Sequence, residues 1–403
     1  MMSLKTQKQK LEKKIGAIVA SRGSHPVFSL ATLLYGGSLL YGAGVRMRQS
    51  LYAHGVLSVG QVNRPVISIG NLTAGGTGKT PLAIHLAKLL DMLGLKVLIV
   101  SRGYKSLSEK TGAVVSDGRT ILCDWRSAGD EPFLMARMLM HVPVMVGKDR
   151  FATASAGLQR FAPDIVLLDD AFQHQGLARD VNLLLLDANE PLGNGHLLPR
   201  GPLREPIAAL KRADAIIFTR CAQPPNEKQR ELARMIHPRP VFYCGHAPVV
   251  RCLVPAMHPL VGAEATKPPA QPGNPLQGRS VFAFAALARN ETFWSTVSGM
   301  GALIQGVMGF SDHHFYSAKD IDGLVQAASQ SGCHTLVTTD KDFVRLPRMS
   351  LPLDLIVLGV DIDFGVDYDR WQRFIADRLQ PFARLAERKA HRKGTTGSLL
   401  WMF

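Results

Sequence analysis

A glycine-rich loop between an apolar run and a helix start constrains this chain more than any other feature. Residues 66–80 read VISIGNLTAGGTGKT, and Pro81 follows. A loop that cradles a triphosphate needs glycine where a Cβ would block inward-facing N–H groups, and it needs a helix N-terminus aimed at the anion. The context predicts a nucleoside triphosphate site and disfavours an incidental glycine-rich turn. Its residues are Gly75, Gly76, Thr77, Gly78, Lys79 and Thr80.

Two residues of this loop have expected roles in phosphate chemistry. Lys79 is expected to reach the β- and γ-phosphates, and Thr80 to ligate Mg²⁺. One position departs from the usual GxxxxGK[ST] pattern, because Thr73 stands where the first glycine is expected.

The apolar pattern predicts an α/β fold with a P-loop NTPase-like parallel sheet. Short apolar runs alternate with helical stretches such as 81–93 and 132–140, which is typical of a parallel sheet covered on both faces. The runs are 66–70, 97–101, 142–146, 165–168, 183–187 and 215–219. A second alternation predicts a smaller α/β domain, with strands at 281–285, 303–308, 334–339 and 355–360, and helices at 317–329 and 369–379.

The length of 403 residues also suggests more than one core. The expected division has a basic segment with a membrane-associated helix (1–60), a P-loop kinase domain (61–250), a Pro-rich linker (251–279), the smaller domain (280–380) and a basic tail (381–403). Five scattered cysteines form no CxxC pair, which favours a reducing compartment over a disulfide framework or a zinc site.

Positive charge is concentrated at the two ends of the chain. The formal net charge is +15, and residues 1–50 carry eight Lys or Arg against one Glu. The charge flanks the uncharged segment Val27–Val45, which favours attraction to anionic lipid over nucleic-acid binding. This segment is interpreted as an interfacial anchor, with a spanning helix or a buried core helix as alternatives.

Acidic residues follow one predicted strand and precede one predicted helix. Asp169 and Asp170 end the strand 165–168, where carboxylates bind Mg²⁺ beside a phosphate loop, and Gln173 follows on the turn. Asp130 and Glu131 precede the helix 132–140. Capping alone explains carboxylates at a helix start, but a kinase also needs one to accept the proton of the attacking hydroxyl.

Basic candidates lie on a proline-rich loop and in the smaller domain. Arg200 and Arg204 could bind phosphate oxygens or simply face solvent. In the segment 311–314, SDHH, adjacent histidines suit a metal pair poorly. A single histidine polarised by a carboxylate is the better functional reading, and a structural histidine is the alternative. The segment 338–342, TTDKD, could face the same cleft.

Taken together, these segments resemble the tetraacyldisaccharide 4′-kinase (lipid A 4′-kinase) family. The resemblance rests on motifs in the family's order, including its own P-loop variant with Thr73. The motifs are SIGNLTAGGTGKTP (68–81), SRGY (101–104), GDEP (129–132), LLDDAFQH (167–174), LPRGPLREP (198–206), SDHH (311–314) and TTDKD (338–342). The smaller domain departs in detail, with Asp340 where the family usually has Glu.

The resemblance implies transfer of the ATP γ-phosphoryl group to the 4′-hydroxyl of a tetraacyldisaccharide 1-phosphate, giving lipid IVA. It implies a catalytic base at Asp130 paired with His313, metal roles for Thr80, Glu131, Asp169 and Asp170, and nucleotide contacts from Gln173 and Arg204. It also implies an acylated disaccharide phospholipid as substrate and a location on the cytoplasmic face of the inner membrane, held by the N-terminal helix. The protein is expected to be a monomer and to bind no nucleic acid.

Two other functions remain open at this stage. Another P-loop enzyme, such as a soluble small-molecule kinase or a GTPase, would explain the loop but not the basic anchor, and no NKxD guanine motif is present. A nucleotide-switched membrane-recruitment protein would explain both features without a transfer reaction.

Overall fold

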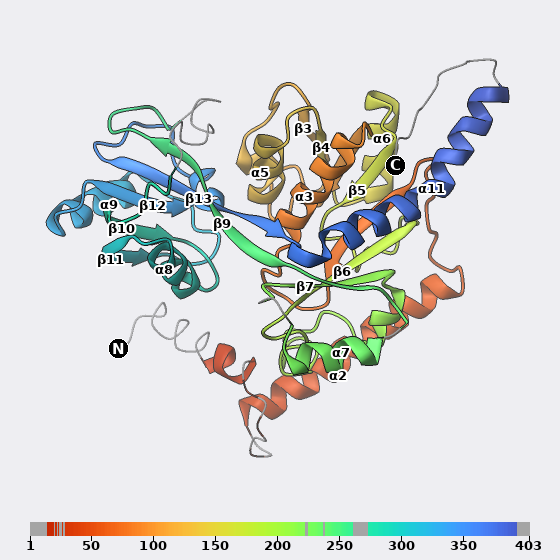
Figure 1. Cartoon of the computed structure of the whole chain (residues 1–403). Helices are drawn as coiled ribbons and strands as arrows, with labels where there is room; N and C mark the ends of the chain where they lie inside the picture. The colour runs from red at the N-terminus through yellow and green to blue at the C-terminus, as the bar shows by residue number, and fades with distance from the viewer. Residues whose placement is uncertain are drawn as a thin grey trace.

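The chain folds into two lobes, each built on one sheet (Figure 1). The computed structural model describes residues 14–19, 21, 23, 26, 29–221, 225–236, 238–260 and 273–392. The start of the segment 27–45, residues 261–272 of the expected linker, and parts of both basic ends lie outside the described residues.

The large lobe contains an eight-stranded sheet in the order β3-β4-β2-β5-β1-β6-β7-β8. All of its pairings are parallel except β3 with β4. Its strands are β1 (Val66–Asn71), β2 (Val97–Ser101), β3 (Ala113–Asp117), β4 (Pro143–Val146), β5 (Ile165–Leu168), β6 (Val181–Asp187), β7 (Ala215–Thr219) and β8 (Val241–Tyr243). Its helices are α2 (Leu30–Ala53), α3 (Lys79–Met92), α4 (Trp125–Ala128), α5 (Asp130–Met138), α6 (Arg150–Phe161), η1 (Ile207–Arg212), α7 (Glu227–Ile236) and α11 (Tyr368–Arg392).

Both faces of the large sheet are buried, as the uniformly apolar strands predict. Within β1, Ile67 and Ile69 pack in the core that includes α3 and α5, whereas Val66 packs with α6 on the opposite face. The β1 residues Val66–Asn71 are all buried. The parallel α/β architecture expected from the sequence is therefore confirmed.

The small lobe contains a five-stranded sheet in the order β11-β10-β12-β13-β9, in which only β9 is antiparallel to its neighbour. Its strands are β9 (Gly245–Val254), β10 (Ser280–Ala285), β11 (Leu303–Gly309), β12 (Thr335–Thr339) and β13 (Asp354–Asp363). Its helices are α8 (Asn290–Gly299), α9 (Ala318–Gln330), α10 (Asp340–Phe343) and η3 (Gly365–Asp367). A capping box between Ser317 and Asp320 starts α9, as the spacing predicts.

The lobes differ from the expected domain boundaries on both sides of the small lobe. β9 continues through residues 251–254 of the expected linker, because it completes the small sheet beside β13. α11 begins inside the range expected for the smaller domain, yet Trp371 and Ile375 pack in the large-lobe core. β9 and β13 thus run between the lobes, and the first part of α11 packs on the large lobe (Figure 1).

The apolar N-terminal segment forms most of α2, which lies against the loop 197–206 of the large lobe, here called the arginine loop because it carries Arg200 and Arg204. Ser38 Oγ donates to Leu197 O at 2.8 Å, and Tyr41 donates to Arg204 O at 2.9 Å. Much of its apolar surface is open, with Leu33 72% and Leu40 78% exposed. Among the described residues, no helix is both long and apolar enough to span a bilayer.

Candidate active site

The phosphate loop joins β1 to α3 at the carboxyl end of the large sheet, where ligands bind in such folds. Gly75 and Gly78 have φ values of +119° and +86°, which favour glycine. Gly78 caps α3, and a Cβ there would lie 2.6 Å from His246 Nε2. Both the backbone conformation and the packing therefore require glycine at position 78.

Buried polar side chains brace the loop from neighbouring strands. Asn71 Nδ2 donates to Thr73 O at 2.7 Å, and Gln173 Nε2 donates to Asn71 O at 2.7 Å. Thr219 Oγ1, at the end of β7, donates to Thr77 O at 2.8 Å. Gln173 thus holds the strand that carries the loop.

Thr73 also has a structural place in this arrangement. It forms an isolated bridge with Leu203 of the arginine loop and is 7% exposed. Next to it, Ala74 N donates to Pro202 O at 2.7 Å. The position that is usually glycine joins the phosphate loop to the arginine loop.

Lys79 and Arg204 converge on Asp170. Lys79 Nζ lies 3.6 Å from Asp170 Oδ1, and Arg204 Nη1 lies 3.1 Å and 3.2 Å from the two carboxylate oxygens. Burial acts to raise the pKa of Asp170, but the charges of Lys79 and Arg204 outweigh it and hold that pKa below its ordinary value. Two cations and one carboxylate thus surround the start of α3.

At the end of β5, the surroundings of Asp169 raise its pKa, whereas those of Asp170 lower the pKa of that residue. Its side chain accepts a hydrogen bond from Ser101 Oγ at 3.2 Å, while its Oδ1 is buried without a partner. Burial, together with the negative charges of Glu131 and Asp170, raises the pKa of Asp169 to about 7. An unpartnered buried carboxylate oxygen near a phosphate loop suits a divalent cation.

The residues beside the phosphate loop fit a Mg²⁺ ion that binds together with a nucleotide. Thr80 is 2% exposed at the first turn of α3, beside the loop. Within the described part of the chain, no three His, Cys, Asp or Glu side chains converge as a metal cage. Mg²⁺ bound with a nucleotide takes most ligands from phosphates and water, so one or two carboxylates and a hydroxyl suffice.

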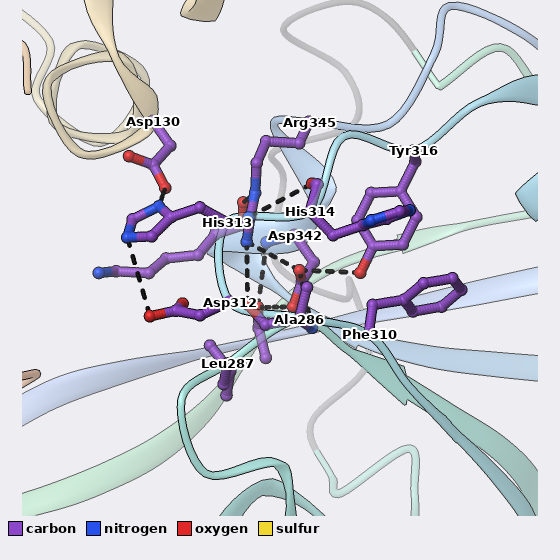
Figure 2. A network of polar contacts seen from close by, with 12 residues as sticks. Asp130, Ala286, Leu287, Phe310, Asp312, His313, His314, Tyr316, Asp342 and Arg345 are labelled. Carbon is purple, nitrogen blue, oxygen red and sulfur yellow. Dashed lines mark hydrogen bonds and ion pairs between the residues drawn. The ribbon is translucent and has the colours of Figure 1, made fainter. Parts of the chain in front are cut away.

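Asp130 and His313 meet across the two lobes (Figure 2). Asp130 begins α5, and His313 Nδ1 hydrogen-bonds its Oδ2 at 2.8 Å. Burial acts to raise the pKa of Asp130, but the hydrogen bond from His313 and the charge of Lys341 outweigh it and lower that pKa. The same hydrogen bond raises the pKa of His313 against the effect of its burial. The two side chains therefore favour an ionised pair.

Glu131, the next residue of α5, also pairs with the small lobe. Lys341 Nζ donates to Glu131 Oε1 at 2.6 Å. The TTDKD segment therefore does face the cleft, since β12 ends and α10 begins there. Sequence reasoning did not single out this lysine; its signal was a basic residue at the carboxyl end of a predicted strand.

Two other basic candidates lie in structural positions. Arg200 is 4% exposed and donates to Ile18 O at 2.7 Å, so it holds the N-terminal segment. Neither alternative for Arg200, a phosphate contact or a solvent-facing side chain, agrees with this position, because its buried guanidinium donates to backbone carbonyls. His314 bonds Asp320 at 3.2 Å and stacks on Phe310. The adjacent histidines thus serve different carboxylates.

A P-loop domain with paired carboxylates and a second lobe closing over them defines a phosphotransferase of the P-loop class. The family model described as tetraacyldisaccharide-1-P 4′-kinase matches residues 30–380. The chain belongs to this family.

Named relatives and one solved structure agree over most of the chain. Tetraacyldisaccharide 4′-kinase of Desulfatibacillum aliphaticivorans is 40% identical over 85% of this chain and 91% of its own length. That of Geobacter metallireducens is 38% identical over 80% and 90%. The crystal structure of the Aquifex aeolicus family member in complex with ATP matches with a TM-score of 0.69 and 30% identity, over 87% of this chain and 99% of that one.

Proposed function

We propose that this chain transfers the γ-phosphoryl group of ATP to the 4′-hydroxyl of a tetraacyldisaccharide 1-phosphate. The product is lipid IVA, a precursor in lipid A biosynthesis. Membership of the family supports this reaction. The observation that carries the site assignment is the 2.8 Å bond between Asp130 and His313, because it puts an oriented carboxylate beside the Glu131 and Lys79 charges.

Asp130 acts as the general base for the acceptor hydroxyl. Its lowered pKa keeps it ionised at neutral pH, so it can accept a hydrogen bond and then the proton as the hydroxyl attacks. His313 orients the carboxylate and stabilises its charge before transfer. Because the pair spans two lobes, the complete site exists only when the lobes are together.

The loop residues Gly75–Thr80 bind the triphosphate through backbone N–H groups, and Lys79 contacts its β- and γ-oxygens. Arg204, now on Asp170, is placed to take a phosphate oxygen when nucleotide is bound. Thr80, Asp169 and Asp170 hold Mg²⁺, with Glu131 in the surrounding shell. The metal supplies charge neutralisation on the phosphates.

The enzyme works at the cytoplasmic face of the inner membrane, with α2 lying in the interface. Exposed Leu33, Leu40 and Met47 (64%) give this helix an apolar surface where the acyl chains of the substrate would stay. The proposed general base, Asp130, and its partner His313 come from one chain, which supports a monomer as the active unit.

The test is product analysis with wild type and Asp130→Asn. Wild-type protein with ATP, Mg²⁺ and the disaccharide 1-phosphate should give a doubly phosphorylated lipid by mass spectrometry. Loss of the base should reduce kcat by about 10²–10⁴-fold, while binding of an ATP analogue is retained. Asp322→Asn, on the exposed side of α9, is the matched control.

Near wild-type turnover by Asp130→Asn would refute the base assignment. Two other outcomes separate the remaining functions. Phosphorylation of a soluble acceptor instead of the lipid favours a small-molecule kinase. Hydrolysis coupled to membrane release, without phosphorylated lipid, favours a nucleotide-switched recruitment protein.

A further inference from the structure

Two consecutive carboxylates of the large lobe each meet a basic residue of the small lobe. Asp130 bonds His313 at 2.8 Å, and Glu131 bonds Lys341 at 2.6 Å. Both carboxylates lie in the first turn of α5. The contact between the lobes at the site is thus a double pair, and the reaction proposed above gives no role to Lys341.

A buried network in the small lobe lies beside His313 (Figure 2), and its member Arg345 donates to Lys341 O at 3.0 Å. Its centre is Asp342, which is completely buried and follows Lys341 in α10. Asp342 Oδ1 accepts hydrogen bonds from Tyr316 at 2.9 Å and from Arg345 at 2.8 Å. Arg345 also donates to His314 O at 3.4 Å, next to His313.

This network fixes the His313 segment relative to Lys341. Ala286 N donates to Asp342 Oδ1 at 3.1 Å, and Thr339 donates to its Oδ2 at 2.6 Å, so β10 and β12 join the same carboxylate. His313 itself has a φ of +60°, an uncommon conformation that the surrounding contacts must maintain. A movement of α10 would therefore move His313 as well.

Acidic side chains surround Lys341 where the two lobes meet. Carboxylates face it from both lobes, with Glu131 and Asp130 on α5 and Asp340 on its own helix. The closest of these contacts is the one with Glu131, whose Oε1 lies 2.6 Å from Lys341 Nζ. Without Lys341, the partly exposed Glu131 would keep its negative charge near Asp169 with no partner from the small lobe.

We propose that Lys341 is a positioning residue that latches the small lobe onto α5 through Glu131 and thereby sets His313 on Asp130. The lysine acts through the position of the lobe and not on the reacting atoms. The kinetic consequence rests on the proposed function, whereas the effect on the distance between the lobes does not.

The test measures the distance between the lobes in the full-length, nucleotide-free protein by pulsed electron spin resonance. Spin labels are placed at Gln159→Cys on α6 and Asp322→Cys on α9, both exposed. Cys123 is the one partly exposed cysteine among the five and is replaced by Ser. Lys341→Met should lengthen and broaden the distance distribution, and Lys341→Arg should restore it.

The kinetic arm uses the same variants without labels. Lys341→Met should lower kcat by about 10- to 100-fold through misplacement of the His313–Asp130 pair, with affinity for an ATP analogue changed less than twofold. Lys341→Arg should recover most of the activity. Lys319→Met, an exposed lysine of the same lobe, should match wild type in both measurements.

Glu131→Gln breaks the same pair from the large lobe and keeps the test decisive if Lys341→Met folds poorly. It should broaden the distances, and adding Lys341→Met should broaden them no further, because the two changes remove one interaction.

Unchanged distances in both single variants would overturn the proposal. A loss of kcat in Lys341→Met with unchanged distances would also overturn it, since the lysine would then act on the reactants. Absence of lipid product from wild type would refute the proposed function and leave the distance result intact.

Discussion

The neighbours of two carboxylates of the site shift their pKa values in opposite directions. Asp130 is partly buried beside His313 and Lys341; its burial acts to raise its pKa, but these two partners outweigh that effect and lower it. Asp169 is buried beside the negative Glu131 and Asp170, and its pKa rises to about 7. In the proposed reaction Asp130 is the base, and Asp169 would hold a cation whose charge offsets the negative neighbours that raise this pKa.

The pH dependence of the reaction should report the His313–Asp130 pair. In His313→Ala, burial of Asp130 is opposed by fewer partners, so its pKa rises and the acid limb of kcat/KM moves to higher pH. Rate profiles of this variant and of His334→Ala, an exposed histidine, make the comparison. An acid limb that stays at its wild-type position would contradict the pairing.

The sign of the stability change follows from the same two shifts. Asp130 has a lowered pKa, so its contribution is present above its ordinary value of 3.8 and is lost as the pH falls. His313 has a raised pKa, so its contribution is complete below 6.5 and is lost as the pH rises through the raised value. The pair therefore stabilises the contact between the lobes most fully between pH 3.8 and 6.5.

At the scale of elements, α2 combines a fixed face with an open apolar one. Ser38 and Gly42 are buried, and Ser38 Oγ both donates to Leu197 O and accepts from Arg200 N at 3.0 Å. A Cβ at Gly42 would lie 2.8 Å from Leu197 Cδ1. The glycines that weaken this segment as a membrane span thus allow its close packing on the large lobe.

The open face of α2 should determine binding to vesicles. Leu33 and Leu40 are seven positions apart on this face, and burying each in the interface is worth roughly 1.5–3 kcal/mol. Leu33→Glu with Leu40→Glu should reduce co-sedimentation with anionic vesicles by at least about tenfold. Met92→Glu with Val366→Glu, which adds the same charge at exposed apolar positions elsewhere, should bind as wild type does. If the variant with Leu33→Glu and Leu40→Glu bound vesicles as well as wild type does, α2 would not be the membrane contact.

Elements with strong periodicity were predictable, and short edge elements were not. The predicted strands 97–101, 165–168 and 215–219 agree with β2, β5 and β7 to the residue. β3 and β8 were not predicted, because they are short edge strands whose residues include polar or half-exposed positions. β9 was missed because its burial is mostly intermediate, and only its pairing with β13 defines it.

At the scale of the whole molecule, the two lobes share strands and a helix. β13 continues beside β9 after its pairing with β12 ends, and Ile362 and the following Phe364 pack in the large-lobe core. Trp371 of α11 stacks on Phe364 with ring centroids 4.7 Å apart and meets Phe242 edge-on at 5.3 Å. Phe364 and the first part of α11 therefore anchor the small lobe to the large one.

Removing this anchor should destabilise the protein as a whole. Trp371 is fully buried, and Trp371→Ala should cost about 3–5 kcal/mol of unfolding free energy. Trp371→Phe should retain most of the stability, and the exposed Asp377→Ala should be neutral. Denaturant midpoints followed by circular dichroism make the comparison, and an unchanged midpoint in Trp371→Ala would exclude the anchoring role.

The sequence alone determined the phosphate loop, the parallel sheet and the acids after β5, because these depend on local spacing. A glycine pattern, an apolar period and a strand end are written in consecutive residues. Only the tertiary structure brought Asp130 to His313 and Glu131 to Lys341, removed Arg200 from the site and returned α11 to the large lobe. Those contacts join residues far apart in the chain, and their energies depend on burial and neighbouring charge, which local spacing does not encode.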